Sequence, residues 1–281
     1  MGKLSRHQHP NGLEYLQVES ALCQARIFFQ GAQIDSFIPT GKAPLLWVSD
    51  ADDYSPGNGI RGGIPVCWPW FGMDGRDGFP QHGFARTREW QLLSHEWQGE
   101  VLALAFGLEI QETDRRFWPH DTQVELHFLL GESLTVSLIN RNLGQEPVRI
   151  TQALHSYFPI TDINALRATG FAGARYIEFG EGPYAQDGDE VHFDRETDRV
   201  YTQLGPVQQL HTTDGTIEVS REHSHSAVLW NPWIDKSKRL ARFNDEDYLT
   251  MVCLEAANVL EDALELAPGE RHCLTTRIRW C

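Results

Sequence analysis

Short strand-like segments, repeated along almost the whole chain, limit the possible folds more than any other feature of the sequence. They are rich in Val, Ile, Leu, Thr, Phe and Trp and are bounded by Gly, Pro, Asn or Asp, which is typical of β-strands. Apolar and polar residues alternate clearly in 124–130 (VELHFLL) and 133–142 (SLTVSLINRN), as in half-buried antiparallel strands. The predicted strands are 13–20, 23–39, 44–49, 89–97, 101–110, 122–131, 133–143, 148–160, 227–234, 248–260 and 271–280.

Helical patterns are scarce, so the strands determine the fold class. Only 109–117 and 232–241 are predicted to form short helical turns. The spacing between strands favours a sandwich or barrel over βαβ units. No repeat or linker divides the 281 residues, and the polar stretch 181–199 is predicted to be a surface excursion. We therefore expect an all-β chain, with residues 1–281 forming a single large antiparallel β-sandwich, a size that such folds reach as one unit.

Charge and cysteine content exclude several classes of partner. The net charge of −15 argues against binding to nucleic acid or to anionic membranes, both of which require basic surfaces. No apolar run approaches the roughly 20 residues of a membrane span, and residues 1–12 contain no apolar leader segment. The five cysteines are odd in number and lack C-x-x-C spacing, which indicates reduced thiols. We expect a cytoplasmic protein and, because no apolar stripe invites assembly, a monomer.

The stretch 59–72 (GIRGGIPVCWPWFG) is the first candidate for a binding site. Its glycines and prolines exclude a regular central strand, and bulky apolar side chains on loops usually line pockets. Arg61, beside two glycines, suits an oxyanion or a phosphate, although a solvated turn arginine is the commoner explanation. Residues 230–233 (WNPW), with Lys236, are predicted to form a pocket rim or to lie in the core.

Two further segments combine a histidine with polar or cationic neighbours. QHGFAR (81–86) brings His82 together with an amide and an arginine, so that His82 is either an acid–base group or a capping residue. His155 lies in an apolar strand, where a buried structural histidine is the usual explanation. His223 and His225 share one face of a strand, but no third ligand has a clear spacing, so we predict no metal site.

Glu255 is the strongest single-residue anomaly, because it interrupts the apolar segment 252–259 (VCLEAANV). Burying a carboxylate without a partner costs several kcal/mol. Partial burial also raises the pKa of a carboxyl group and makes it an effective general base near neutral pH. Asp198 is predicted to accept hydrogen bonds from a sugar or simply to occupy a turn. Phosphate-binding loops, dinucleotide-binding fingerprints and the G-x-S-x-G motif are absent from the sequence.

Taken together, these segments resemble the galactose-mutarotase-like superfamily and, within it, its hexose-6-phosphate branch, the glucose-6-phosphate 1-epimerases. The resemblance extends from residue 60 to about residue 259, with the motifs in the order of the family. They are IRGGIPVCWPWFG, QHGFAR, FWPHD (117–121), LHSYF, ETDRVY (196–201), WNPW and VCLEAANV. The residues after Glu255 depart from the family, which leaves the preferred sugar open.

The resemblance implies a β-supersandwich with its active site in a cleft on the concave sheet, and interconversion of the α and β anomers of a hexose 6-phosphate, most simply glucose 6-phosphate. It assigns His155 as general acid and Glu255 as general base, and it implies no cofactor. The substrate-binding residues that it implies are Arg61, Gln81, His82, Arg86 and Asp198. The apolar faces of the sugar would pack on Trp68, Trp70, Phe71 and Trp230. Arg61 and Arg86 would hold the phosphate.

Two alternatives stay open at the level of sequence. One is an aldose 1-epimerase that acts on unphosphorylated hexoses, which would be favoured if Arg61 and Arg86 were paired with acidic neighbours. The other is a carbohydrate-binding protein without catalysis, although binding alone does not need an acid–base pair such as His155 and Glu255.

Overall fold

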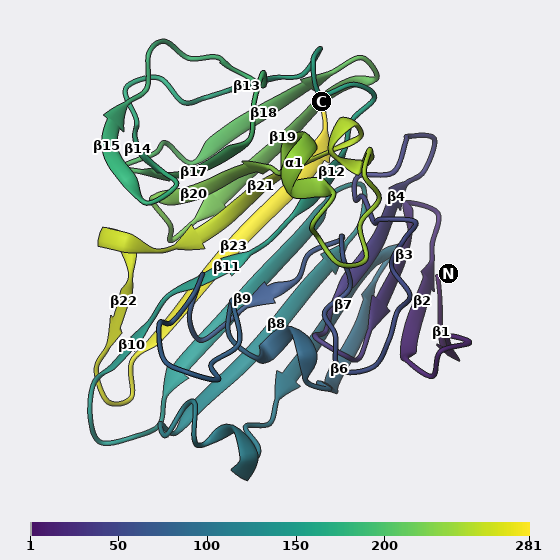
Figure 1. Cartoon of the computed structure of the whole chain (residues 1–281). Helices are drawn as coiled ribbons and strands as arrows, with labels where there is room; N and C mark the ends of the chain where they lie inside the picture. Colours follow the sequence, from purple (N-terminus) through teal and green to yellow (C-terminus); the bar gives the residue numbers. More distant parts are fainter. Residues whose placement is uncertain (1) are drawn as a thin grey trace.

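The structure, a computed structural model that describes residues 2–281, is built almost entirely from antiparallel strands (Figure 1). The largest sheet has nine strands, in the order β16 (Val191–His192), β13 (Arg167–Thr169), β18 (Val207–Thr212), β19 (Gly215–Glu222), β23 (Arg271–Trp280), β9 (Leu134–Asn142), β8 (Thr122–Leu130), β7 (Val101–Leu108) and β6 (Gln91–Gln98). Strands β6 to β9 follow one another in sequence, and β23 from the C-terminal end pairs with β9.

A second sheet of eight strands carries most of the residues singled out by the sequence. Its order is β15 (Glu181–Ala185), β14 (Arg175–Glu178), β17 (Thr197–Thr202), β20 (Ser226–Asn231), β21 (Met251–Asn258), β11 (Gln152–Leu154) and β5 (Val66–Cys67). The eighth strand, β12 (Tyr157–Pro159), also pairs with β21.

Smaller elements complete the structure. The N-terminal sheet comprises β1 (Lys3–Gln8), β2 (Glu14–Glu19), β3 (Cys23–Phe28) and β4 (Ile34–Pro39), and β10 (Val148–Ile150) pairs with β22 (Leu264–Leu266). The helical segments are α1 (Trp233–Ser237) and the 3₁₀ turns η1 (Ala85–Thr87), η2 (Glu112–Asp114), η3 (Asp247–Leu249) and η4 (Leu260–Asp262). Within residues 2–281, no helix is long or apolar enough to cross a membrane.

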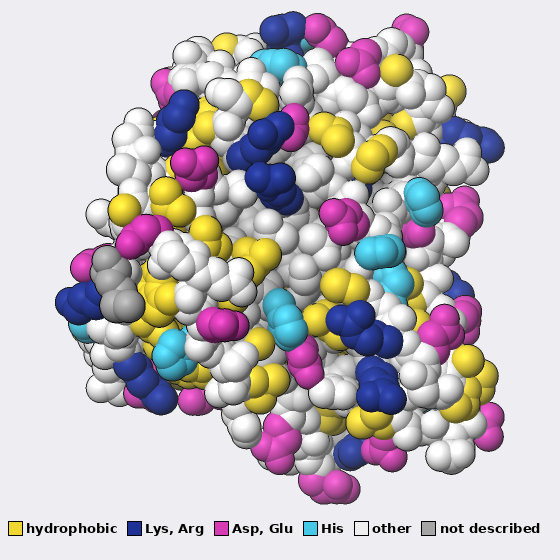
Figure 2. All heavy atoms as spheres, turned by 180° about the vertical axis from the view of Figure 1, so that it is seen from behind, with side chains coloured by type: hydrophobic (Ala, Val, Ile, Leu, Met, Phe, Trp, Pro, Cys, Tyr) yellow, Lys and Arg dark blue, Asp and Glu magenta, His cyan; other side chains and the backbone are white. Residues whose placement is uncertain are grey.

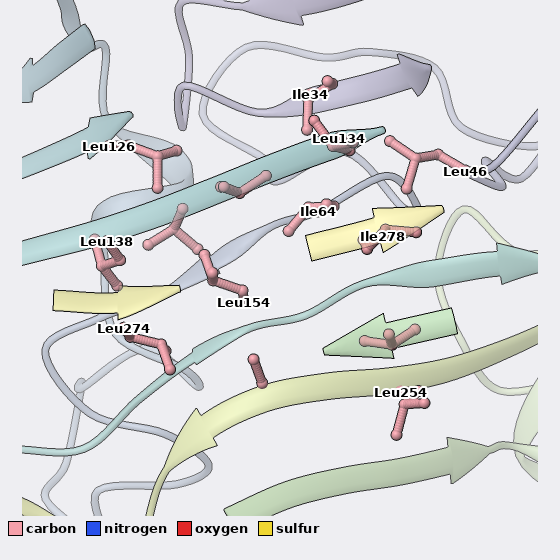
Figure 3. Packing of buried hydrophobic residues seen from close by; sticks show 14 of the residues in the cluster. Ile34, Leu46, Ile64, Leu126, Leu134, Leu138, Leu154, Leu254, Leu274 and Ile278 are labelled. Carbon is pink, nitrogen blue, oxygen red and sulfur yellow. The ribbon is translucent and has the colours of Figure 1, made fainter. Parts of the chain in front are cut away.

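The main core lies between the two large sheets. Figure 3 shows Leu126, Leu138 and Leu274 of the nine-stranded sheet and Leu154 and Leu254 of the eight-stranded sheet within one cluster of buried side chains. All five side chains are almost completely buried. Removing apolar surface of this extent from water is the principal force that holds the two sheets together.

Alternation along β21 gives the eight-stranded sheet two different faces. Val252 and Leu254 belong to the main core, whereas Met251 and Cys253 belong to a second, smaller apolar cluster on the opposite face. Because side chains alternate along a strand, Glu255 shares this second face with Cys253. The unusual glutamate is therefore directed away from the main core.

The prediction of an antiparallel all-β sandwich is confirmed, and so are the helical turns, at η2 and α1. The strand predicted at 44–49 is wrong, because this segment contributes only a single bridge from Val48 to Gly62. The stretch 181–199 lies largely at the surface, as predicted, but it also contains β15, β16 and the start of β17, which the sequence analysis did not predict as strands. All five residues of β15 are exposed, so no apolar alternation marks it as a strand.

Gly83 allows two segments of the candidate site to approach each other closely. Its φ is +71°, and a Cβ at this position would lie 1.9 Å from the carbonyl oxygen of Trp68. We expect Gly83→Ala to lower the free energy of unfolding by at least about 2 kcal/mol, through left-handed strain and the clash with backbone. Gly75→Ala is the control for strain alone, because Gly75 has a φ of +87° and nothing within 4 Å. Urea unfolding that gives equal losses for both variants would contradict the close-approach argument.

Candidate active site

A cavity of about 320 Å³ opens on the second face of the eight-stranded sheet. It brings together most of the candidate residues, although they come from widely separated parts of the sequence. Those that line it are Arg61, Phe71, Gln81, His82, Arg86, His155, Asp198, Trp230 and Glu255. Their roles remain predictions, but the structure places them around one hollow.

The pairing of strands explains why His155 faces Glu255. β11 and β12 both pair with β21, with Leu154 opposite Ala256 and Tyr157 opposite Cys253. Glu255 therefore lies opposite the short interruption between β11 and β12, which contains His155. The backbone N–H of His155 donates to the carbonyl of Pro65 at 3.0 Å, which fixes this interruption in place.

His155 and Glu255 form a buried acid–base pair. The Nε2 atom of His155 is 3.4 Å from Oε1 of Glu255, and the two residues are 8% and 1% exposed. Within the described part of the chain, Glu255 Oε2 and His155 Nδ1 are buried without a hydrogen-bond partner. Buried polar atoms without partners are rare and destabilising, so this arrangement indicates a ligand that supplies the missing contacts.

Burial shifts the pKa values of this pair in opposite directions. Desolvation raises the pKa of Glu255 well above its ordinary value, and the charge of Asp198 adds to the effect while Arg86 opposes it. Desolvation lowers the pKa of His155 well below its ordinary value, with further lowering by His82, Arg86 and Arg61. Such a pair titrates as a unit, and the two opposite shifts widen the pH range in which it holds one proton. In that state the pair contains both a proton donor and a proton acceptor.

His82 is held as a neutral ring with a known tautomer. The backbone N–H of Gly72 donates to Nδ1 of His82 at 3.1 Å, so the ring proton lies on Nε2. Desolvation, together with the charges of Arg86 and Arg61, lowers the pKa of His82 to about 3. The ring contacts Phe71, with centroids 4.8 Å apart. His82 thus offers a fixed N–H donor to a ligand in the cavity.

Arg61 and Arg86 carry charges that no acidic side chain neutralises. Neither has a carboxylate within 4.0 Å among residues 2–281. One terminal nitrogen of Arg86 donates to the carbonyl of Gln81 at 2.8 Å, and one of Arg61 donates to that of Ala241 at 3.4 Å. Arg61 Nε is buried without a partner in the described chain. This finding removes the pairing with acidic neighbours that would have favoured a neutral ligand.

Asp198 and Lys236 lie together on another side of the cavity. Lys236 Nζ is 3.5 Å from Asp198 Oδ2 and 2.9 Å from Glu196 Oε1. Burial raises the pKa of Asp198, and the ammonium group of Lys236 opposes the rise. Lys236 also lies 5.8 Å from the centre of the Trp230 ring. The carboxylate is well placed to accept hydrogen bonds from hydroxyl groups.

The placement of Trp68 and Trp70 in the pocket wall is wrong. Both belong to the main core, where Trp68 Nε1 donates to Asn140 Oδ1 at 2.7 Å and Trp70 Nε1 donates to the carbonyl of Pro80 at 2.9 Å. The physical reason is alternation, because Val66 lies in the main core with Trp68 and Trp70, whereas Phe71 faces the cavity. Sequence reasoning had weighed only the loop character of this segment.

Three further side chains line the cavity that sequence reasoning did not propose: Tyr157, Val228 and Leu240. Tyr157 lies two residues after His155, and Val228 lies two before Trp230, so strand alternation could have found both. The ring of Tyr157 stacks on that of His155, with centroids 4.8 Å apart. Leu240 follows α1 and has no such pattern.

Among residues 2–281, no three His, Cys, Asp or Glu side chains are arranged to hold a metal ion, and His223 and His225 lie away from the cavity. On the face drawn in Figure 2, acidic and basic side chains are interspersed. The unpaired charges of Arg61 and Arg86 are therefore a local feature of an acidic protein.

Comparisons with known proteins agree with the fold. The family model described as aldose 1-epimerase matches residues 15–279. A Salmonella typhimurium protein named "putative glucose-6-phosphate 1-epimerase" is 34% identical over 274 residues, which cover 95% of this chain and 90% of that protein. An Escherichia coli K12 protein of the same name is 35% identical over 256 residues, covering 89% and 84%.

Solved structures of similar proteins have the same fold. The crystal structure of a "putative mutarotase (YeaD)" from Salmonella typhimurium superposes with a TM-score of 0.91 at 30% identity, and the match covers 98% of this chain and 92% of that one. The crystal structure of HI1317 gives a TM-score of 0.81 at 26% identity, covering 99% of both chains.

Proposed function

The chain belongs to the aldose 1-epimerase family, and we propose that it interconverts the α and β anomers of a hexose 6-phosphate, with glucose 6-phosphate as the first candidate. The observation that carries this proposal is the presence, in one cavity, of a buried acid–base pair and two arginines without acidic partners. The pair suits ring opening of a hemiacetal, and the arginines suit a phosphate group. Two relatives bear the name of this activity.

The reaction needs two proton transfers and no redox step. Glu255 removes the proton of the C1 hydroxyl while His155 protonates the ring oxygen. The bond between C1 and the ring oxygen breaks, and C1 becomes an aldehyde. Rotation about the C1–C2 bond presents the other face of the carbonyl, and the ring closes with the two residues in exchanged roles. Since every proton returns to its donor, the cycle needs no cofactor.

The single proton of the pair must lie on His155 for this direction of transfer. His155 Nε2 and Glu255 Oε1 are 3.4 Å apart, so the proton can pass between them with little movement. The positive charges of Arg61 and Arg86 are among the causes that lower the pKa of His155. A phosphate bound by these arginines would cancel much of that potential and so favour the imidazolium. Substrate binding would then help to prepare the acid.

The remaining cavity residues suit a sugar ring. His82 offers its Nε2–H, Asp198 offers a carboxylate to hydroxyl groups, and Gln81 lies at the exposed edge. Phe71 and Trp230 provide aromatic surface for the apolar faces of a pyranose. All these residues come from one chain, so we propose that the active unit is a monomer.

The test is anomer exchange measured by NMR on glucose 6-phosphate and on glucose. We expect the protein to accelerate exchange of the phosphate ester more than exchange of the free sugar. Faster exchange of free glucose would assign an epimerase of unphosphorylated aldoses. Exchange at the buffer rate for both sugars would leave a carbohydrate-binding protein.

Arg61→Gln tests the binding of the phosphate group separately from the proton transfers. A charge-assisted hydrogen bond contributes roughly 1.5–3 kcal/mol, so KM for glucose 6-phosphate should rise roughly 10- to 100-fold. Exchange of free glucose should change little, because that substrate makes no phosphate contact. The measurement is the ratio of kcat/KM for the two sugars in both proteins. An equal loss on both would count against a role for Arg61 in phosphate binding.

A further inference from the structure

A second, smaller cavity lies directly beside the first. Its volume is about 140 Å³, and it shares Arg61, Arg86 and Tyr157 with the larger cavity. The residue that distinguishes it is Arg242, which the larger cavity does not include. Three segments far apart in the sequence thus bring three guanidinium groups to one hollow, in a chain whose net charge is −15.

Arg242 is held in place through the loop that carries Arg61. One terminal nitrogen of Arg242 donates to the carbonyl of Gly59 at 2.9 Å and lies 3.5 Å from Asp52 Oδ2. The same carboxylate oxygen accepts the backbone N–H of Arg61 at 2.7 Å. Asp52 therefore contacts both the side chain of Arg242 and the backbone of Arg61. The Nε and the other terminal nitrogen of Arg242 form no hydrogen bond with residues 2–281, and they remain available to a ligand.

Gly59 is the point at which Arg86 meets Arg242. A Cβ on Gly59 would lie 3.2 Å from Cδ of Arg86, so the aliphatic part of Arg86 packs directly against this glycine. The carbonyl of the same residue accepts the hydrogen bond from Arg242. Arg61 follows only two residues later. The three arginines therefore line the same cavity and also lie next to one backbone segment, residues 59–61.

The charge and size of the smaller cavity suit a phosphate group. Three arginines and no acidic residue of the described chain line this cavity, and Arg242 lies beside the buried carboxylate of Asp52, which leaves an excess of positive charge. A volume of 140 Å³ corresponds to about four or five water molecules at their share of liquid volume, which suits a tetrahedral group with four oxygens. Planar guanidinium groups are the side chains best matched to phosphate oxygens.

We propose that the phosphate of the substrate is bound in this smaller cavity and that Arg242 is its third cationic ligand, which sets the preference for phosphorylated over free sugar. This inference rests on the proposed function, since it assumes a hexose 6-phosphate in the larger cavity. Arg61 and Arg86, which line both cavities, then mark the passage from the sugar to its phosphate. Arg242 has no part in the proton transfers.

The test compares Arg242→Gln with Arg239→Gln, which removes the same charge from an exposed neighbour in the same loop. The probe is 1,5-anhydroglucitol 6-phosphate, which lacks the anomeric hydroxyl and cannot be turned over, and its binding is measured by calorimetry. We expect about tenfold weaker binding in Arg242→Gln, the loss of one charge-assisted contact, and no change in Arg239→Gln. Arg242→Lys keeps a counter-ion for Asp52 and should recover part of the affinity.

The kinetic measurement distinguishes this inference from the proposed function. In Arg242→Gln, KM for glucose 6-phosphate should rise about tenfold while exchange of free glucose is retained. Unchanged binding of the probe, or an equal loss on both sugars, would overturn the role of Arg242 and leave it as a counter-ion of Asp52. If the wild type accelerates exchange of neither sugar, the proposed function fails, whereas probe binding that depends on Arg242 still supports an anion subsite.

Discussion

Replacing Glu255 by glutamine is expected to remove anomer exchange and, at the same time, to stabilise the folded protein. Glutamine keeps the shape of the side chain but cannot accept the C1 hydroxyl proton. General acid–base catalysis contributes roughly 10²- to 10⁴-fold to a rate, and we expect kcat for glucose 6-phosphate to fall by that range. NMR exchange measurements on both proteins test the loss.

The gain in stability follows from the environment of the carboxyl group. Glu255 is 1% exposed, and desolvation raises its pKa well above the ordinary value of 4.5. Above pH 4.5 and up to the raised pKa, the native state binds more protons at this position than the unfolded state, so the free energy of unfolding falls as the pH rises. Glutamine does not titrate, so the free energy of unfolding of the variant does not fall with pH for this reason.

Glu255→Gln should therefore unfold at a higher temperature than the wild type at pH 7 to 8, by an amount equivalent to roughly 1–3 kcal/mol. The difference should shrink as the pH approaches 4. Glu222→Gln is the matched control, because Glu222 is exposed and distant from the cavity. A variant with full exchange activity would exclude Glu255 as the base. A variant less stable than the wild type at neutral pH would show that the carboxylate is favourably paired.

The sequence was sufficient for the fold class, because apolar alternation and turn residues are local patterns, whereas the roles of the site residues came from the family resemblance and remain predictions. Apolar alternation identified β8 and β9, an apolar run identified β21, and the single charge inside that run identified Glu255. It was not sufficient for the strands between residues 161 and 222. Several of these lie at open sheet edges, and in β18 and β19 two of the buried positions are polar, Gln208 and Arg221, so that apolar alternation does not mark these strands.

Contacts between distant segments were beyond the reach of local patterns. Arg242 lies about 180 residues from Arg61, and only the fold brings its guanidinium to the same hollow. The opposition of His155 and Glu255 likewise depends on the register of β11 and β12 on β21. The errors at Trp68 and Trp70 have a different origin. The sequence does place both tryptophans in alternation with Val66, but the segment is rich in Gly and Pro and was therefore interpreted as a loop.

His155→Gln should reduce kcat for glucose 6-phosphate roughly 10²- to 10⁴-fold, with a smaller change in KM, because His155 transfers a proton and does not hold the phosphate. The rate of the wild type should depend on the pair holding one proton. Burial raises the pKa for loss of that proton and lowers the pKa for gain of a second one. The wild-type rate should therefore stay level across neutral pH and fall only outside this broad window.

The pH dependence of protein stability gives an independent check of the lowered pKa of His155. Because the pKa of His155 is lowered in the folded protein, the unfolded state binds more protons below about pH 6.5, and the free energy of unfolding falls as the pH drops. His155→Gln should lose this part of the acid sensitivity, which thermal unfolding at pH 5 and pH 7.5 would measure. His95→Gln, at an exposed position, should retain it. A His155→Gln protein with an unchanged rate would exclude His155 as the general acid.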